Sequence, residues 1–151
     1  MILAIDPGTA QSGWCVLDGL HVINSGVELN ADILARIGYS VPPDAGIHAL
    51  AIEMVASYGM PVGREVFETV RWIGRFQQAW RAPEEVRLIY RRDVKLHLCG
   101  SMKAKDPHVW QALIDKLGAV GTKAAPGPLY GVKSHARSAV AVAVVAQETT
   151  K

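Results

Sequence analysis

The first part of the sequence alternates short apolar runs with turn residues. Residues 2–5 form an apolar run that contains β-branched side chains, and a Pro-Gly pair breaks it directly after Asp6. Apolar residues return over 14–17, and an Asp-Gly turn leads into another run over 21–27. The pattern predicts three strands that pair in antiparallel order, with a carboxylate at the end of the first.

Later segments alternate between helical and strand periodicity. The spacing predicts, in chain order, a helix over 30–39, a loop at 42–46, a strand over 48–53, a loop at 57–63, a helix over 64–81, a strand over 86–90, and helices over 91–100, 106–118 and 133–147. Five strands interleaved with helices indicate an α/β protein. The helix over 64–81 carries a wide apolar face, with Phe67 and Trp72 beside it, which suits packing on a sheet and on a second subunit. The residues of this face that follow helical spacing are Val66, Val70, Ile73, Phe76, Gln77 and Trp80.

Length and composition favour one compact unit. At 151 residues, with 50% hydrophobic and 20% charged residues, the chain has room for a single domain over 1–151. Its longest apolar run, 139–146, is far shorter than the ~20 residues of a membrane span, and no signal-peptide pattern opens the sequence. We therefore expect a soluble, cytoplasmic protein.

The formal net charge of +2 hides an uneven distribution. Residues 1–86 carry five Arg and ten Asp or Glu, whereas residues 87–151 carry eleven Lys or Arg and four Asp or Glu, so the two parts stand at −5 and +7. An acidic part that holds site carboxylates and a basic part that holds phosphates suit a nucleic-acid enzyme that uses a metal ion. Such a split is also frequent on ordinary protein surfaces.

Two carboxylates and one imidazole stand where a metal site would form. Asp6 and Glu53 each close a predicted strand, although turn capping is a simpler role for Asp6. His135 and Ser138 lie three residues apart in the first turn of the last helix and share a face, which can point at both strand ends. Surface exposure is the commoner explanation for a His at a helix start, but two oxygens and an imidazole suit a divalent cation.

Short motifs with one specific order span almost the whole chain. They are Ile5-Asp6-Pro7-Gly8-Thr9, Ser12-Gly13-Trp14, Ile52-Glu53, Arg92-Asp93-Val94-Lys95, Leu96-His97-Leu98-Cys99-Gly100, Ser101-Met102-Lys103-Ala104-Lys105-Asp106 and Gln111-Ala112-Leu113-Ile114-Asp115. With the final Ala-rich helix, this order resembles the RuvC-type Holliday-junction resolvases, and most of all their bacteriophage-encoded members.

The resemblance implies a ribonuclease H-like fold: a mixed five-stranded sheet with three antiparallel strands first and helices on both faces. It also implies a homodimeric endonuclease of DNA recombination and repair, which resolves four-way and branched DNA by phosphodiester hydrolysis. Members of the family use two divalent cations, Mg²⁺ or Mn²⁺. In such a site, one ion activates a water molecule and the other stabilises the leaving oxygen.

Carried over residue by residue, the resemblance assigns three metal ligands and leaves a fourth in question. Asp6, Glu53 and His135 match the first three positions, and Ser138 stands where the family usually has Asp. A hydroxyl adds no negative charge to offset two hard cations. Three explanations stay open: Asp106 or water replaces the missing acid, the protein binds junctions without cutting them, or Ser138 is an inactivating substitution. Asp106 precedes a proline, so it is also a natural helix N-cap.

DNA contacts are expected in two places. The candidate phosphate contacts are the basic residues Arg91, Arg92, Lys95, Lys103, Lys105, Lys133 and Arg137. Tyr58 and Met60 correspond in place to the family's loop that probes unstacked bases at the junction centre.

Three other functions compete with junction resolution. Sugar-kinase and actin-type ATPases also open with Asp-x-Gly-Thr, but they need two such lobes and this chain has one. A YqgF-like nuclease of the same fold acts on RNA, and its corresponding helix is not expected to carry the broad apolar face of residues 64–81. A non-catalytic junction-binding protein is favoured by Ser138 alone.

Overall fold

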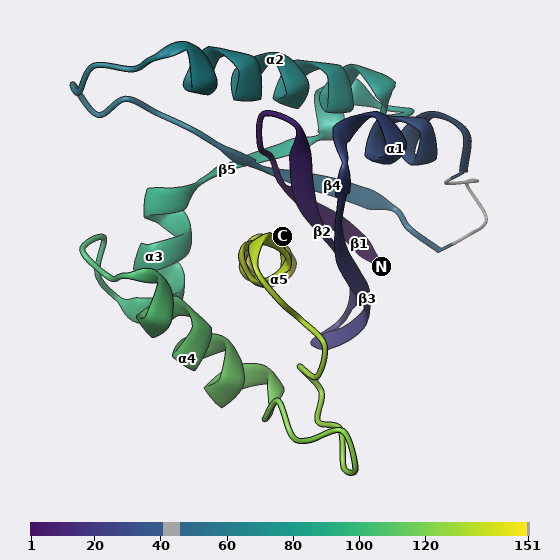
Figure 1. Ribbon diagram of the computed structural model, residues 1–151, viewed down its shortest axis with the longest axis vertical. Coiled ribbons are helices and arrows are strands. Elements are labelled where there is room, and N and C mark those ends of the chain that lie inside the picture. Colours follow the sequence, from purple (N-terminus) through teal and green to yellow (C-terminus); the bar gives the residue numbers. More distant parts are fainter. Residues whose placement is uncertain (41–45, 151) are drawn as a thin grey trace.

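Five strands form one mixed sheet at the centre of the protein (Figure 1). The computed structural model describes residues 1–40 and 46–150. The strands are β1 (Ile2–Asp6), β2 (Gln11–Asp18), β3 (His21–Leu29), β4 (Ala49–Met54) and β5 (Arg87–Tyr90), in the order β3-β2-β1-β4-β5. The first three strands are antiparallel, while β4 runs parallel to β1 and β5 parallel to β4. This confirms the predicted five-stranded sheet and its opening meander.

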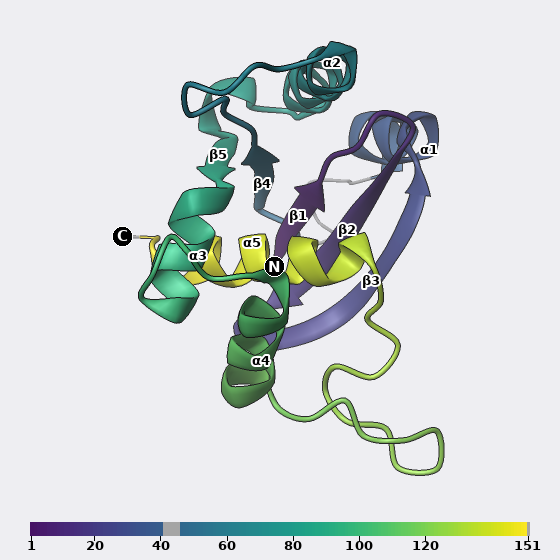
Figure 2. The ribbon, with the colours of Figure 1, turned by 60° about the vertical axis from the view of Figure 1, so that its left-hand side comes forward.

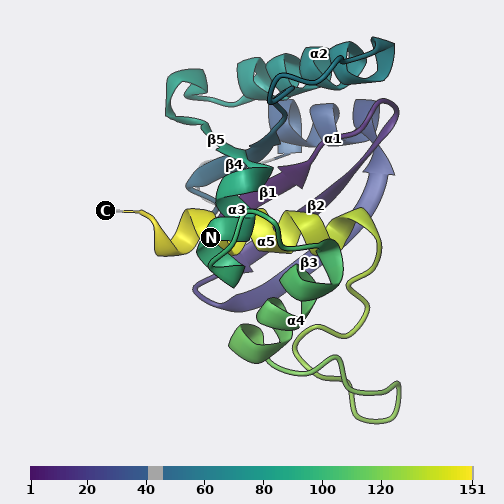
Figure 3. The same cartoon turned by 90° about the vertical axis from the view of Figure 1, so that its left-hand side faces the viewer.

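Helices cover both faces of the sheet, also as predicted. They are α1 (Asn30–Ala35), which continues as a π-helical turn (Arg36–Ser40), then α2 (Arg64–Ala79), a 3-10 turn (Pro83–Glu85), α3 (Arg91–Cys99), α4 (Asp106–Leu117) and α5 (His135–Glu148). Helices α1 and α2 lie on one face, and α5 crosses the other with α3 and α4 outside it (Figures 2 and 3). The loop predicted at 42–46 lies, except for Gly46, outside the described residues.

Strand alternation decides which residues of the central strands reach the site. Ala4 of β1 and Ala51 of β4 belong to the core beneath α5, whereas the residues on either side of each belong to the core beneath α1 and α2. Because side chains two residues apart share a face, Asp6 and Glu53 point to the same side as these alanines. Both carboxylates therefore face α5.

Helix α5 lies unusually close to the sheet. Every buried residue of α5 is Ala or Val, and these small side chains let its axis approach the strands. Near its first turn, a Cβ on Gly13 would stand 2.2 Å from the carbonyl oxygen of His135. Only glycine fits there, so β2 holds the start of α5 beside the end of β1.

Two local predictions differ from the structure. Asp106 is the first residue of α4 rather than its N-cap, which is Lys105, and the carboxylate of Asp106 is engaged by Arg91 instead. In α2, Ile73 and Phe76 of the expected apolar stripe are buried, but Val70 is 36% exposed and Thr69 is buried in its place, so the helix is turned slightly from the expected orientation. No helix within the described part of the chain has the length and apolar character needed to cross a membrane.

Candidate active site

Asp6 and Glu53 lie side by side at the carboxyl ends of two paired parallel strands. Ile5 of β1 is in register with Ile52 of β4, which places the two acids one step further along both strands. Their side chains are 12% and 8% exposed, so both carboxylates sit at the floor of the site rather than in bulk water. The predicted pairing of two strand-end carboxylates is thus what the strand geometry produces.

The environment makes the negative charges of this pair costly. Burial, together with the neighbouring charge of Asp6, raises the pKa of Glu53 to about 7, although Arg91 opposes the shift. Burial also raises the pKa of Asp6, against the effect of its hydrogen bond to His135. Two adjacent acids with raised pKa values indicate anionic charge that a bound cation would relieve.

His135 reaches Asp6 from the first turn of α5. Its Nδ1 lies 2.9 Å from Oδ2 of Asp6, and its side chain is 66% exposed. An ionised carboxylate can only accept hydrogen bonds, so Nδ1 carries the proton in this pair, and Nε2 is not engaged by Asp6. The preceding residue, Ser134, is the N-cap of α5 and has a φ of 52°, a positive value that is uncommon for a residue other than glycine.

A buried polar network holds the loop that follows Asp6. Ser12 Oγ accepts a hydrogen bond from the backbone N–H of Gly8 at 3.1 Å and donates to Oδ1 of Asn30 at 2.5 Å. The amide Nδ2 of Asn30 donates back to the carbonyl oxygen of Gly8 at 2.9 Å. Ser12 and Asn30 are fully buried, so this closed network fixes the backbone beside the site. Sequence reasoning missed Asn30, because its partners lie far away in the chain.

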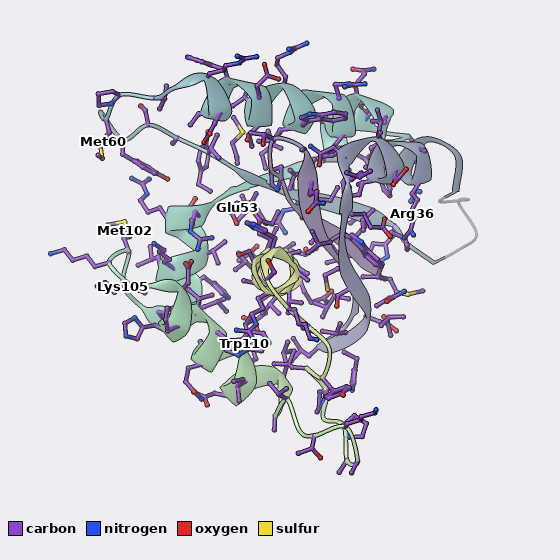
Figure 4. The ribbon with its side chains drawn as sticks, in the orientation of Figure 1. Arg36, Glu53, Met60, Met102, Lys105 and Trp110 are labelled. Atoms are coloured by element: carbon purple, nitrogen blue, oxygen red, sulfur yellow. The ribbon has the colours of Figure 1, made fainter. Side chains whose placement is uncertain are left out.

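Arg91 forms the opposite wall of the site. Its Nη1 donates to both carboxylate oxygens of Glu53, at 3.4 and 3.5 Å, and its Nη2 donates to Oδ1 of Asp106. Figure 4 shows Glu53 in the interior, between the sheet and α5. The sequence suggested Arg91 as a phosphate contact, but here its guanidinium is paired with two carboxylates.

Ser138 lies beside Glu53 and Arg91. It lines a cavity of about 100 Å³ together with Glu53, Arg91, Lys95 and Asp106. The structure therefore brings together all the predicted catalytic candidates: Asp6, Glu53, His135, Ser138 and Asp106.

The donor set suits a hard divalent cation. Carboxylate oxygens are the preferred ligands of Mg²⁺ and Mn²⁺, and an imidazole is compatible with Mn²⁺. Among residues 1–40 and 46–150, no three His, Cys, Asp or Glu side chains already stand in a ready-made metal-binding arrangement. Burial of Glu53, together with the neighbouring charge of Asp6, raises the pKa of Glu53, and this is the observation that fits the two carboxylates to a cation.

The predicted base-probing residues project from one edge of the molecule. Tyr58 has a φ of 49° and is 55% exposed, and the guanidinium of Arg92 lies 5.3 Å from its ring centroid. Met60 is 71% exposed at the tip of the same loop. Figure 4 shows Met60 on the same side of the molecule as Met102 and Lys105 of the α3–α4 connection.

The basic candidates differ in how they are held. Lys103, Lys105 and Lys133 are exposed, while Lys95 is half-buried against the site cavity. Arg137 stacks on the ring of Trp110 at 4.2 Å, which ties the first turn of α5 to α4. The basic candidates thus include three exposed lysines and, with Arg91, two further cations that line the site cavity, Lys95 and Arg137.

Comparisons with known proteins show which fold this is. No protein-family model matches the sequence, and no curated protein does. Among solved structures, the chain is similar to Thermus thermophilus RuvC in complex with Holliday junction substrate, with a TM-score of 0.68 and 23% identity over 97% of this chain and 94% of that one. A structure of Thermus thermophilus RuvC gives a TM-score of 0.61 and 22% identity over 95% and 90%. The chain thus has a ribonuclease H-like fold, and within that class its fold is that of RuvC, as the sequence motifs predicted.

Proposed function

We propose that this protein is a metal-dependent endonuclease that resolves four-way DNA junctions by phosphodiester hydrolysis. The observation that carries the proposal is the cluster of Asp6, Glu53 and His135 at the strand ends. It lies in a chain with the fold of RuvC, whose structure contains a Holliday junction substrate. Such an activity would serve DNA recombination and repair in the cytoplasm.

Each residue of the cluster has a defined task. Asp6, Glu53 and His135 would hold Mg²⁺ or Mn²⁺, which when bound supplies a water of lowered pKa and a counter-charge for the phosphate. Asp6 orients the imidazole of His135 through Nδ1, so Nε2 is left to accept a proton or to bind the ion. Glu53, at the floor of the site, supplies a buried carboxylate whose negative charge a bound cation would stabilise.

The surrounding surface would hold the DNA. The exposed lysines near the site, Lys103, Lys105 and Lys133, suit phosphate contacts, which position a duplex without reading its sequence. Tyr58 and Met60 project beyond them and would stack on bases that are unpaired at the junction centre, worth ~1–3 kcal/mol per base.

A second copy of the chain would complete the enzyme. On the outer side of α2, Phe67 is 60% exposed and Val70 is 36% exposed, three residues apart and thus on one face. We propose that this face forms a two-fold homodimer interface, which matches the two-fold character of a four-way junction. Phe67→Asp should then lower dimer affinity about 30-fold or more, measured as a fall in mass by light scattering at micromolar concentration. A wild-type protein that is monomeric at that concentration would contradict the interface.

One observation favours a second candidate, a junction-binding protein that does not cut. Ser138 brings a neutral hydroxyl to the site, and Arg91 already neutralises part of the charge of Glu53. Both features reduce the negative charge available to metal ions.

A single assay separates the candidates. A labelled four-way junction, a linear duplex of the same sequence and an RNA duplex are incubated with the protein in Mg²⁺ or Mn²⁺, with the Asp6→Asn variant as control. We expect metal-dependent cleavage of the junction only, absent from Asp6→Asn. Binding without cleavage in both proteins would favour the non-catalytic candidate, and cleavage of RNA alone would favour a YqgF-like nuclease.

A further inference from the structure

Arg91 is placed at the site by the strand register. Glu53 of β4 pairs with Ile89 of β5, and β5 ends at Tyr90, so Arg91 begins α3 beside the end of β4. From there its guanidinium contacts Glu53 with one nitrogen and Asp106 with the other. A planar guanidinium held by two carboxylates is a fixed positive charge inside the site, because Arg stays protonated at any working pH.

The side chains around the site carry enough negative charge for no more than one divalent cation. Three carboxylates surround it, from Asp6, Glu53 and Asp106, and Arg91 contributes one positive charge. With the three carboxylates ionised, these four side chains balance at −2, which matches a single Mg²⁺ or Mn²⁺, and Lys95 and Arg137 in the same cavity reduce the net negative charge further. Two divalent ions beside Arg91 would leave the site strongly positive, and hard cations in one cleft need anionic oxygens between them.

The other groups that face the cavity add positive charge or none. Lys95 and Arg137 line it as well as Arg91, and Ser138 contributes only a hydroxyl. A second divalent ion near Ser138 would therefore meet three cationic side chains. Within the described part of the chain, the carboxylates that line this cavity, Glu53 and Asp106, are both paired with Arg91.

We propose that Arg91 takes the place of a second metal ion: the site binds one divalent cation through Asp6, Glu53 and His135, and the guanidinium of Arg91 supplies the other fixed positive charge. This inference rests on the proposed nuclease function and replaces the two-ion arrangement that the sequence resemblance implies. It also explains why a neutral residue is tolerated at position 138.

Metal binding without DNA tests the proposal directly. Mn²⁺ is titrated calorimetrically into the wild-type protein, Arg91→Gln, Arg91→Lys and the double variant Arg91→Gln/Ser138→Asp, with Arg92→Gln as the matched control. We expect one Mn²⁺ per chain in the wild type, in Arg91→Lys and in the control. Arg91→Gln should bind Mn²⁺ about tenfold more tightly or better, because a positive charge next to Glu53 is gone. The double variant should bind two ions.

Thermal melting gives a second readout that does not depend on stoichiometry. Mn²⁺ should raise the melting temperature of Arg91→Gln by more than that of the wild type, since the ion replaces a missing counter-charge. Two ions bound by the wild type, or identical binding by the wild type and Arg91→Gln, would overturn the inference while leaving junction cleavage, and so the proposed function, intact. Failure of every variant to bind Mn²⁺, together with an uncut junction, would overturn both.

Discussion

The two halves of the site are built on different principles. The strand half, Asp6 and Glu53, lies on two paired strands. Their register and the alternation of side chains fix the face of the sheet to which each carboxylate points. The helix half, Arg91, Asp106 and His135, comes from the first turns of three helices that meet only in the folded protein. The strand half supplies buried negative charge. In the helix half, Arg91 neutralises part of that charge, Asp106 holds Arg91, and His135 contacts Asp6. Buried negative charge thus resides on the sheet, and the groups that compensate it come from the neighbouring helices.

The strand half should be indispensable for cleavage. Asp6→Asn or Glu53→Gln removes an anionic oxygen with little change of shape, and we expect cleavage to fall on the order of 10²–10³-fold or more. Junction binding should persist or strengthen, because the basic surface is untouched and negative charge is lost. Cleavage rates and metal-free gel shifts measure the two effects separately. An equal loss of binding would contradict this division of roles.

His135 links the two halves, so its removal should have the next largest effect. His135→Ala takes away the partner of Asp6 and the free Nε2, and the rate should fall on the order of 10²-fold. His21→Ala, at the exposed start of β3, is the matched control and should keep the wild-type rate. An unchanged rate in His135→Ala would remove this residue from the active site.

Changes within the helix half should be milder and should reveal how its charge is balanced. Ser138→Asp adds a carboxylate to the cavity that holds Glu53 and Arg91, so Mg²⁺ and Mn²⁺ affinity should rise several-fold, by about 3- to 10-fold. Cleavage at low metal concentration should rise with it. Calorimetric titration and cleavage rates on the same junction measure both.

Asp106→Asn is the informative counterpart to Ser138→Asp. It frees Arg91 from one of its two partners, and a loss of cleavage larger than the gain from Ser138→Asp would mean that Asp106 has taken over the role of the missing acid. Unchanged cleavage in Asp106→Asn would mean that Asp106 only holds Arg91 and takes no part in cleavage.

The sequence predicted the strand half for a simple physical reason. An apolar run broken by Pro-Gly fixes where β1 ends, and two-residue alternation then fixes the side to which Asp6 points. The helix half was harder to predict from the sequence, because the contact between Arg91 and Glu53 depends on the pairing of β5 with β4. No local pattern encodes that pairing.

Helix rotation was equally hard to read from the sequence. In α2, the stripe of Thr69, Ile73 and Phe76 competes with an apolar stripe that includes Val70, and both follow helical spacing. Because Thr69 carries a polar hydroxyl, the sequence pattern did not mark it as a buried residue. Packing against the sheet, which the sequence does not show, decides between them.

The anchoring of the helix half should have the smallest effect, and it depends on pH. At the far end of α5, Glu148 binds Lys116 of α4 at 2.6 Å and His97 of α3 at 2.6 Å, so one carboxylate ties three helices together. The hydrogen bond from Lys116, and next that from His97, lowers the pKa of Glu148 in spite of partial burial. A carboxyl with a lowered pKa in the folded state stabilises the fold fully above its ordinary pKa near 4.5, and this stabilisation is lost as the pH falls through the lowered value.

Glu148→Gln should therefore lower the melting temperature by about 2 °C at pH 7, and by progressively less as the pH falls below 4. Glu68→Gln, which breaks a longer and more exposed contact with Arg71 at 3.6 Å within α2, is the matched control and should change the melting temperature less at any pH. Because Glu148 lies at the opposite end of α5 from His135, cleavage measured well below the melting temperature should stay at the wild-type rate. If the difference in melting temperature between Glu148→Gln and wild type is the same at pH 7 and pH 3, the contacts of the ionised Glu148 are not what holds α3 and α4 to α5.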